Sequence, residues 1–538
     1  MISHSIFNDV LGPIMAGPSS SHSAGCARIG RMTRLLWGKE IRKATVVYDA
    51  KGSYPSTCVG QGSNFGFTGG LLGLKNDDPR MKDSIKLAKE MGVDISFTEE
   101  VLSQRHPNEA RIDIYDEDGE VGLSVLTFST GGGMFEIVEM DGFPVFMDGS
   151  KEQIYVCCYP WAARKFYDKL ERVAKKITVR SPKGTVLAFC NTMICAEDFT
   201  ISSQEIDALI EELKNEKGVA YVRKGEVVLP VPMKPENTPV FSKAEAALAY
   251  AKETGKEMWQ LAIDYECSLG YVTSEEVWQQ AEHTLDIMKA ATTPPDFAIT
   301  EMFGFLPYQC QDMQQKANKI KTVNTGYLDK AMMYALAVME NSCAHNIVVA
   351  SPTAGSSGVI PAAILAVGEE MGCTKEEMIK GLLASGLFGA FIANQASFGA
   401  EVAACQAENG SASAMAAAGV VQLLSGNAEQ GFKAASLSLQ NMLGLICDPV
   451  GGLTEIPCIS RNVSAMANAV QSANMVVLGF DPVIPLDETI FSMYEVGQML
   501  PAELRCTCKG GLCNTKTAKC IVASLDEKRQ NTIDNKGV

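Results

Sequence analysis

The chain has 538 residues, of which 46% are hydrophobic and 20% are charged, and its formal net charge is −16. This length allows two or three domains with a large core, and the composition is that of a soluble globular protein. The negative charge argues against a nucleic-acid partner, because phosphate binding needs a basic face. The first residues carry no basic start and no apolar run, and no apolar stretch reaches membrane-spanning length, so we expect a cytoplasmic protein without a membrane anchor.

Residues 1–150 are predicted to form a small α/β domain. Strands are expected at Lys43–Tyr48 and Ala110–Tyr115, and the second leads through an acidic turn into a hairpin with Val121–Phe128. Arg80–Met91 has the apolar spacing of a helix.

Residues 151–240 mix helix and strand patterns, and no chemistry is visible in them. They end in the proline-rich stretch Val227–Pro239, which indicates an extended linker and a domain boundary.

Residues 241–520 are predicted to be almost wholly helical, and 521–538 form a polar tail. Apolar residues recur at three- and four-residue spacing in four segments, which are Lys243–Lys252, Lys256–Cys267, Ser274–Ala291 and Leu328–Cys343. The predicted fold class is therefore α+β and multidomain, with a small N-terminal α/β domain followed by a mostly all-α domain.

Three polar loops have the composition of anion-binding sites. The first holds Ser19, Ser20, Ser21 and His22 before helix-forming residues, and hydroxyls with free backbone N–H groups can hold a carboxylate there. The second is Ser129 with Gly131, Gly132 and Gly133 after a strand; the third holds Thr353 and Ser356 after an apolar run. Each loop also has a purely structural interpretation. The first would be a serine-rich helix cap, the second a flexible turn and the third a plain turn.

The cysteines give the most specific chemical signal. The chain has 17 of them, and most are expected to be small buried apolar residues in a reducing cell. Cys405, Cys447 and Cys458 differ, because the last two flank a turn with two Gly and two Pro that can present both thiolates to one centre. Three soft ligands without an obvious fourth indicate an iron–sulfur cluster with one open iron.

Several motifs together resemble the iron–sulfur-dependent L-serine dehydratases (L-serine ammonia-lyases) in their single-chain form with fused β and α domains. GPSSSHSAG and STGGGM are similar to motifs of the small β domain of that family. ASPTAGSSGVIPA, EVAACQAE and CDPVGGLTEIPCISRN resemble the catalytic α domain, and ELRCTCKGGL resembles a C-terminal segment of single-chain relatives. The resemblance covers roughly 1–150 and 241–520 and leaves 151–240 unexplained.

The resemblance implies a [4Fe–4S] cluster held by Cys405, Cys447 and Cys458, with the fourth iron free for the substrate. That iron would act as a Lewis acid on the hydroxyl of L-serine while a base removes the Cα proton, giving aminoacrylate and finally pyruvate and ammonia. The serine carboxylate would be held by the loop residues Ser19, Ser20, Ser21 and His22 together with Ser129 and Gly131–Gly133, with Thr353 and Ser356 as further substrate contacts. An amino-acid-degrading enzyme that feeds gluconeogenesis and assembles as a homodimer is expected.

The sequence departs from the family at the expected base. Many relatives carry a His in a Gly-x-Gly-His-Gly-like stretch, whereas Gly60–Gly66 here has Ser63 and Asn64 instead. The chain has five His, and His22, His106 and His345 are the candidates for a base near neutral pH, with His22 favoured. Whether Cys506, Cys508, Cys513 or Cys520 reaches the site stays open.

Other interpretations remain. The same cluster could act on L-threonine or L-cysteine, or serve as a non-catalytic iron–sulfur sensor. Electron transfer usually needs four closely spaced Cys ligands, and a zinc site usually needs C-x2-C pairs, which the core cysteines do not provide. A pyridoxal enzyme is not excluded by pattern, because its Lys is often locally unmarked.

Overall fold

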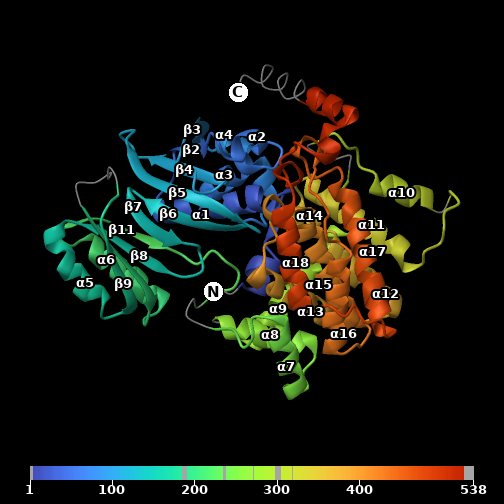
Figure 1. Cartoon of the computed structure of the whole chain (residues 1–538). Helices are drawn as coiled ribbons and strands as arrows, with labels where there is room; N and C mark the ends of the chain where they lie inside the picture. Colours follow the sequence, from blue (N-terminus) through green and yellow to red (C-terminus); the bar gives the residue numbers. More distant parts are fainter. Residues whose placement is uncertain are drawn as a thin grey trace. The chain divides into compact units, whose positions relative to one another are not determined.

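The computed structural model describes residues 4–183, 191–233, 238–270, 272–296, 304–317 and 319–525 (Figure 1). The chain divides into two compact units, which we call the sheet unit (Ser21–Lys234) and the helical unit (Met1–Ser20 with Pro235–Val538). Residues 234–237 of the predicted linker and residues 526–538 of the predicted tail lie outside the described residues, and residues 516–525 are helical. The α+β fold class is confirmed.

The larger sheet of the sheet unit has six strands in the order β3-β2-β4-β5-β6-β7. The strands are β2 (Lys43–Asp49), β3 (Asp94–Glu100), β4 (Glu109–Tyr115), β5 (Val121–Gly131), β6 (Met134–Met140) and β7 (Phe143–Met147). Only the pair β2–β3 is parallel, and the other neighbours are antiparallel. The predicted hairpin is therefore present as β4–β5, with Ile112 opposite Val125.

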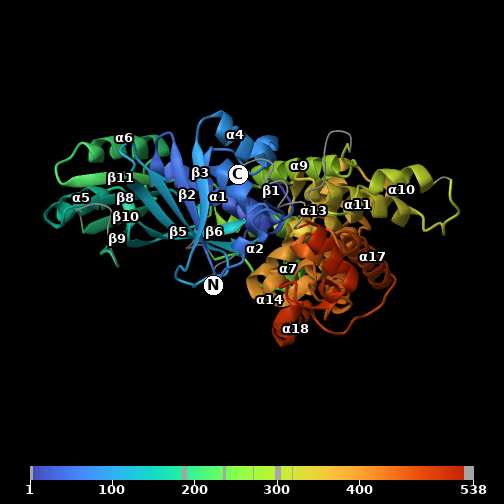
Figure 2. The ribbon, with the colours of Figure 1, turned by 90° about the horizontal axis from the view of Figure 1, so that it is seen from above.

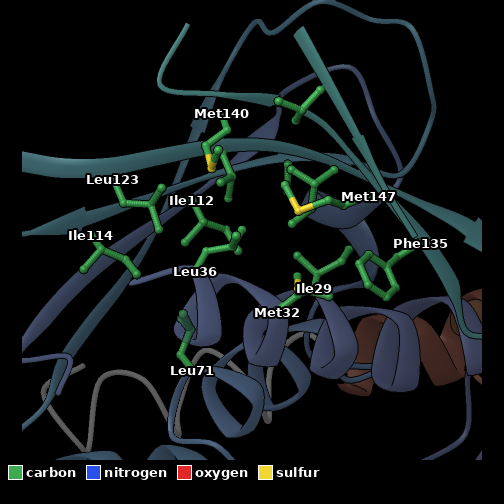
Figure 3. Close-up of a cluster of buried hydrophobic side chains, with 14 of the residues drawn as sticks. Ile29, Met32, Leu36, Leu71, Ile112, Ile114, Leu123, Phe135, Met140 and Met147 are labelled. Atoms are coloured by element: carbon green, nitrogen blue, oxygen red, sulfur yellow. The ribbon is translucent and has the colours of Figure 1, made fainter. Parts of the chain in front are cut away.

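The core of this sheet is formed by alternate residues of its strands and one face of a helix. α1 (Gly25–Trp37) packs on β5 and β6 and on α3 (Ser63–Leu71). Figure 3 shows side chains from α1 and from the strands pointing into one apolar cluster. α2 (Tyr54–Thr57) and α4 (Ser84–Glu90) complete this part; the helix predicted at Arg80–Met91 begins as a 3-10 turn at Pro79–Asp83.

The strands described between residues 153 and 225 form a second sheet that the sequence did not reveal. Its elements follow the order β-α-β-β-α-β: β8 (Gln153–Cys158), α5 (Ala163–Leu170), β9 (Ala174–Arg180), β10 (Thr192–Phe199), α6 (Ser203–Lys214) and β11 (Val219–Gly225). The strands lie antiparallel in the order β11-β8-β10-β9, which is the ferredoxin-like arrangement. The segment predicted as an intervening α/β stretch therefore contains a complete supersecondary unit.

The helical unit contains most of the helices, and Figure 2 shows them from a second side. They are α7 (Ala244–Thr254), α8 (Met258–Leu269), α9 (Ser274–Ala291), α10 (Cys310–Ala317), α11 (Tyr327–Cys343), α12 (Val359–Met371), α13 (Lys375–Gln395), α14 (Ala400–Cys405), α15 (Ser411–Leu423), α16 (Ala428–Gln440), α17 (Cys458–Val477) and α18 (Leu486–Met499). The four helices predicted from apolar spacing are present as α7, α8, α9 and α11. Both views place α10 at the edge of this unit, beside α11.

The centre of the helical unit is α15, every residue of which is buried. It packs against α13, α16, α17 and α12. A Cβ on Gly419 would lie 2.7 Å from the carbonyl oxygen of Gly381, so the close approach of α15 and α13 requires glycine there. The run of small residues in α15 thus brings the neighbouring helices close together.

The first residues of the chain belong to the helical unit, not to the sheet unit. β1 (Ile14–Ala16) pairs antiparallel with β12 (Ile347–Val349). Ahead of it, the fully buried Glu266 of α8 accepts hydrogen bonds from the Ser5 hydroxyl and, over 2.8 Å, from the Ile6 N–H. Burial raises the pKa of Glu266 to about 7. Residues 4–16 are therefore anchored at two places, at Ser5 and Ile6 by Glu266 and at Ile14–Ala16 by β12.

No single helix among the described residues is long and apolar enough to cross a membrane. The helical segments Lys375–Gln395 and Ala400–Leu423 reach the length and composition of a membrane span only when they are taken together. The chain bends by 83° between them.

Candidate metal centre

Cys405 stands at a break between helices. It ends α14, and the single π-helical turn Gln406–Gly410 follows it before α15 begins. The preceding Ala404 has a φ of 61°, a conformation that costs a non-glycine residue about 1–3 kcal/mol. Glu408 follows three residues later, so its side chain lies on the same side of the turn as the thiol. The Cys405 sulfur is 3.9 Å from Glu408 Oε2.

Cys447 lies in an extended segment that pairs with the C-terminal part of the chain. Its N–H donates to the Leu504 carbonyl over 2.9 Å, and the Cys506 N–H donates back to the Cys447 carbonyl over 3.1 Å. The Cys447 thiol is hydrogen-bonded to Cys405 and Cys506, and these bonds together with burial raise its pKa well above the usual value. Of the C-terminal cysteines, Cys506 is therefore the one that contacts Cys447.

Cys458 is the first residue of α17, directly after Pro457. The turn between Cys447 and Cys458 contains Gly451 and Gly452 with φ values of 66° and 70°, which favour glycine. The Cys458 thiol is buried, and this burial raises its pKa, as do the nearby charges of Cys405 and Glu408. The two Gly thus serve the turn that the sequence predicted.

One group of donor atoms in the described chain lies close enough to hold a metal ion. Cys405, Glu408 and Cys447 each contribute a ligand atom, and these atoms all lie within 4.8 Å of one another. Cys458 is not part of that group. The structure therefore brings together two of the three predicted cysteines and adds a carboxylate that the sequence interpretation did not nominate.

Thr353 and Ser356 lie beside this group. Thr353 Oγ1 donates to Glu408 Oε1 over 2.9 Å, and the Ser356 hydroxyl is 3.2 Å from Thr353 Oγ1. A Cβ on Gly355 would lie 3.2 Å from Glu408 Oε1, so the loop approaches the carboxylate closely. Burial raises the pKa of Glu408 to about 7. The third polar loop of the sequence is thus in contact with the candidate metal centre.

The serine-rich loop begins in the helical unit and continues in the sheet unit. Ser19 and Ser20 follow Pro18, whose carbonyl accepts a hydrogen bond from Thr454 Oγ1 in the turn between Cys447 and Cys458. Within the sheet unit, Ser129 Oγ donates to the Ser21 carbonyl over 2.7 Å. The two loops that were predicted separately are therefore in contact.

The glycine run after Ser129 forms a tight turn between β5 and β6. Gly131, Gly132 and Gly133 have φ values of 106°, 59° and 81°, so all three residues use a conformation that favours glycine. The Gly133 carbonyl accepts a hydrogen bond from Arg28 Nη1 over 2.7 Å.

The three candidate histidines have different surroundings. His22 is buried, its ring nitrogens lie 3.0 Å from Ser21 Oγ and 3.2 Å from Ser53 Oγ, and burial lowers its pKa to about 4. His106 accepts from the Asn108 N–H over 3.0 Å and stacks on Phe128. His345 is buried with a φ of 57° and lies between α11 and β12 in the helical unit.

Ser63 lies in the stretch where the related motif carries His. It begins α3 and is fully buried, and its hydroxyl is 3.2 Å from the hydroxyl of Tyr48. Here Ser63 is part of the packing between α3 and β2.

The region that holds these cysteines matches a known family. The family model for the serine dehydratase alpha chain matches residues 247–513. The probable L-serine dehydratase alpha chain of Bacillus subtilis is 37% identical over 280 residues, which are 52% of this chain and 93% of that protein. The chain belongs to the serine dehydratase alpha-chain family.

Other relatives extend the match beyond the alpha chain. The L-serine dehydratase alpha chain of Peptoniphilus asaccharolyticus is 35% identical over 284 residues, covering 52% of this chain and 97% of that protein. The probable L-serine dehydratase beta chain of Bacillus subtilis is 43% identical over 148 residues, covering 28% of this chain and 66% of that protein. This serine dehydratase homologue therefore unites alpha-type and beta-type sequence in one chain, and the relatives it matches are named as L-serine dehydratases.

The sequence interpretation of this serine dehydratase homologue missed one site residue, Glu408, and left open which C-terminal cysteine reaches the site. Glu408 stands in the quoted CQAE motif, and its spacing of three residues from Cys405 is the signal that would have found it. Cys506 has no comparable local signal, because its approach to Cys447 depends on a backbone pairing between residues 447 and 505.

Proposed function

We propose that the chain converts L-serine to pyruvate and ammonia, using a [4Fe–4S] cluster held by Cys405, Cys447 and Cys458. The observation that carries the proposal is the group formed by the buried Cys405 and Cys447 with the partly buried Glu408, inside the region that matches the alpha chain. Named relatives are L-serine dehydratases.

The residues present suit an iron–sulfur cluster. Thiolates are soft ligands that bind both zinc and iron–sulfur clusters, so the content of iron and sulfide separates the two. Burial of all three thiols supports a group that must be kept away from solvent. When bound, the cluster would supply a Lewis-acidic iron that helps the serine hydroxyl to leave.

The remaining roles belong to this chain's own side chains. Thr353 would orient the Glu408 carboxylate through their hydrogen bond, and Ser19 and Ser20 would hold the substrate carboxylate beside the turn that contacts Pro18. One of His22, His106 and His345 would accept the Cα proton. The homodimer and the cytoplasmic location stay predictions.

The experiment is anaerobic purification of the full chain, followed by assays with L-serine, L-threonine and L-cysteine. We expect pyruvate and ammonia from L-serine at the highest kcat/KM of the three. A higher kcat/KM with L-threonine or L-cysteine would contradict serine as the substrate while leaving the cluster chemistry in place. A chain that carries a cluster but turns over none of the three would contradict the enzymatic role and favour a sensor.

A further inference from the structure

Arg461 joins the three segments that carry the predicted cluster ligands. It lies on α17, three residues after Cys458, and so on the helix that begins with the third ligand. Its Nη1 donates to the Cys405 sulfur over 3.5 Å and to the Ile446 carbonyl over 2.9 Å. Ile446 is the residue before Cys447. One guanidinium group therefore contacts Cys405 and the residue before Cys447, and it is carried by the helix that begins with Cys458.

Asp448 holds this guanidinium in place. Its Oδ1 accepts from Arg461 Nη2 over 2.8 Å, and only 3% of the Asp448 side chain is exposed. A nearly buried carboxylate needs a partner for its charge, and Arg461 provides it. A planar guanidinium can make these contacts at fixed angles, which the single ammonium of Lys cannot reproduce.

The other oxygen of Asp448 is used by the C-terminal segment 504–513. Asp448 Oδ2 accepts from the Leu512 N–H over 2.8 Å. A Cβ on Gly511 would lie 2.3 Å from the same oxygen, so the segment can approach the carboxylate only with glycine at this position. Asp448 thus bridges Arg461 and the C-terminal segment.

The same segment is fixed at two further places. It pairs with Cys447 through the backbone bonds of Leu504 and Cys506. The thiols of Cys508 and Cys513 both donate to the Pro449 carbonyl, over 3.4 Å and 3.1 Å. The C-terminal segment therefore contacts residues 447, 448 and 449, and Arg461 contacts the same stretch through Asp448.

We propose that Arg461 is a positioning residue that fixes the three ligand segments relative to one another, and that segment 504–513 holds it in place through Asp448. The inference rests on the cluster of the proposed function, but not on which substrate is used. Hydrogen bonds from outer groups to cluster sulfurs tune potential and metal retention, and their loss typically costs about 10- to 100-fold in metal affinity.

The test compares Arg461→Gln and Arg461→Lys with the wild-type chain, with Arg80→Gln as control because Arg80 pairs with Asp78 at an exposed site. Iron and sulfide per chain, the rate of iron loss to a chelator and the midpoint potential of the cluster are measured anaerobically. We expect iron loss about 10- to 100-fold faster in Arg461→Gln, together with a lower midpoint potential. Arg461→Lys should keep the charge and show a smaller change.

A second pair of variants tests the C-terminal segment. Gly511→Ala places a methyl group against Asp448, whereas Gly372→Ala introduces a similar backbone strain, since Gly372 has a φ of 69° and no atom within 4 Å of a built Cβ. We expect faster iron loss only in Gly511→Ala. This pair also keeps the inference testable if Arg461→Gln does not fold.

The outcomes separate the two proposals. Wild-type iron retention and potential in both Arg461→Gln and Gly511→Ala would overturn the positioning role while leaving the cluster intact. A wild-type chain that binds neither iron nor sulfide would instead overturn the cluster of the proposed function. The third outcome combines two results: Arg461→Gln loses its cluster faster than the wild-type chain, and the wild-type chain holds its cluster but does not turn over L-serine. These results would support the positioning role and contradict only the substrate.

Discussion

Thr454 Oγ1 donates a hydrogen bond to the carbonyl of Pro18 over 3.3 Å, although the two residues are 436 positions apart. Thr454 lies in the turn between Cys447 and Cys458, and Pro18 directly precedes Ser19. The contact therefore fixes the start of the serine-rich loop to the turn of the predicted metal centre, inside the helical unit.

Removing the Thr454 hydroxyl should weaken substrate binding. Thr454→Val keeps the shape of the side chain but loses a hydrogen bond worth about 1 kcal/mol, which corresponds to about a five-fold higher KM for L-serine. Steady-state kinetics on the anaerobic enzyme measure this change. Thr454→Ser keeps the hydroxyl and serves as control. An unchanged KM in Thr454→Val would argue against Ser19 and Ser20 as carboxylate contacts.

The candidate base can be found by replacing each histidine separately with Asn. Because burial lowers the pKa of His22 to about 4, His22 is neutral at pH 7 and able to accept a proton. We expect His22→Asn to lower kcat by about 100-fold or more, the usual scale for a lost general base. Exchange of the serine Cα proton with solvent deuterium measures the same step. A larger loss in His345→Asn or His106→Asn would move the role to that residue.

Glu266 should make the folded state less stable as the pH rises. Its folded pKa of about 7 lies above the unfolded value of 4.5, so the folded chain binds the proton more tightly and loses stability between about pH 4.5 and 7. Relative to Glu266→Gln, the wild-type free energy of unfolding should fall by about 2–3 kcal/mol from pH 5 to pH 8. Anaerobic denaturant titrations at both pH values test this, and parallel pH dependences would contradict it.

Gly304 permits a close contact between a backbone segment and Glu455. Glu455 Oε2 accepts from the Phe305 and Leu306 N–H groups over 3.1 Å and 2.9 Å, and a Cβ on Gly304 would lie 1.6 Å from Glu455 Oε1. Gly304→Ala should therefore lower the free energy of unfolding by about 1–3 kcal/mol. Thermal denaturation gives the size of the effect, and faster proteolysis near residue 304 should accompany it. A variant with wild-type stability and proteolysis would show that the segment tolerates displacement of the carboxylate.

Elements set by local patterns could be predicted from the sequence. The helix at Ser274–Ala291 has the predicted bounds, because apolar spacing and a capping box of Thr273 with Glu276 both lie inside one short segment. The strands β2, β4 and β5 were also predicted within a few residues.

Features that depend on distant pairing could not be predicted. The ferredoxin-like sheet requires β8 to lie between β10 and β11, which no local pattern specifies. The first residues join the helical unit because the buried Glu266 accepts their hydrogen bonds, and a single Glu within a helical pattern gives no sign of this. In the metal centre, Cys405 and Cys447 were found by their motifs, whereas Cys506 and the bridge through Asp448 depend on the C-terminal segment.

The most direct test of the central claim is to count iron and acid-labile sulfide in anaerobically purified wild-type and Cys447→Ser chains and to assay pyruvate formation from L-serine in both. Cys373→Ser, at a half-exposed cysteine outside the metal centre, is the control. We predict iron, sulfide, absorbance at about 400 nm and pyruvate in the wild-type and control chains, and loss of all four in Cys447→Ser. A full cluster with turnover in Cys447→Ser, or a wild-type chain that forms pyruvate without iron and sulfide, would contradict the account.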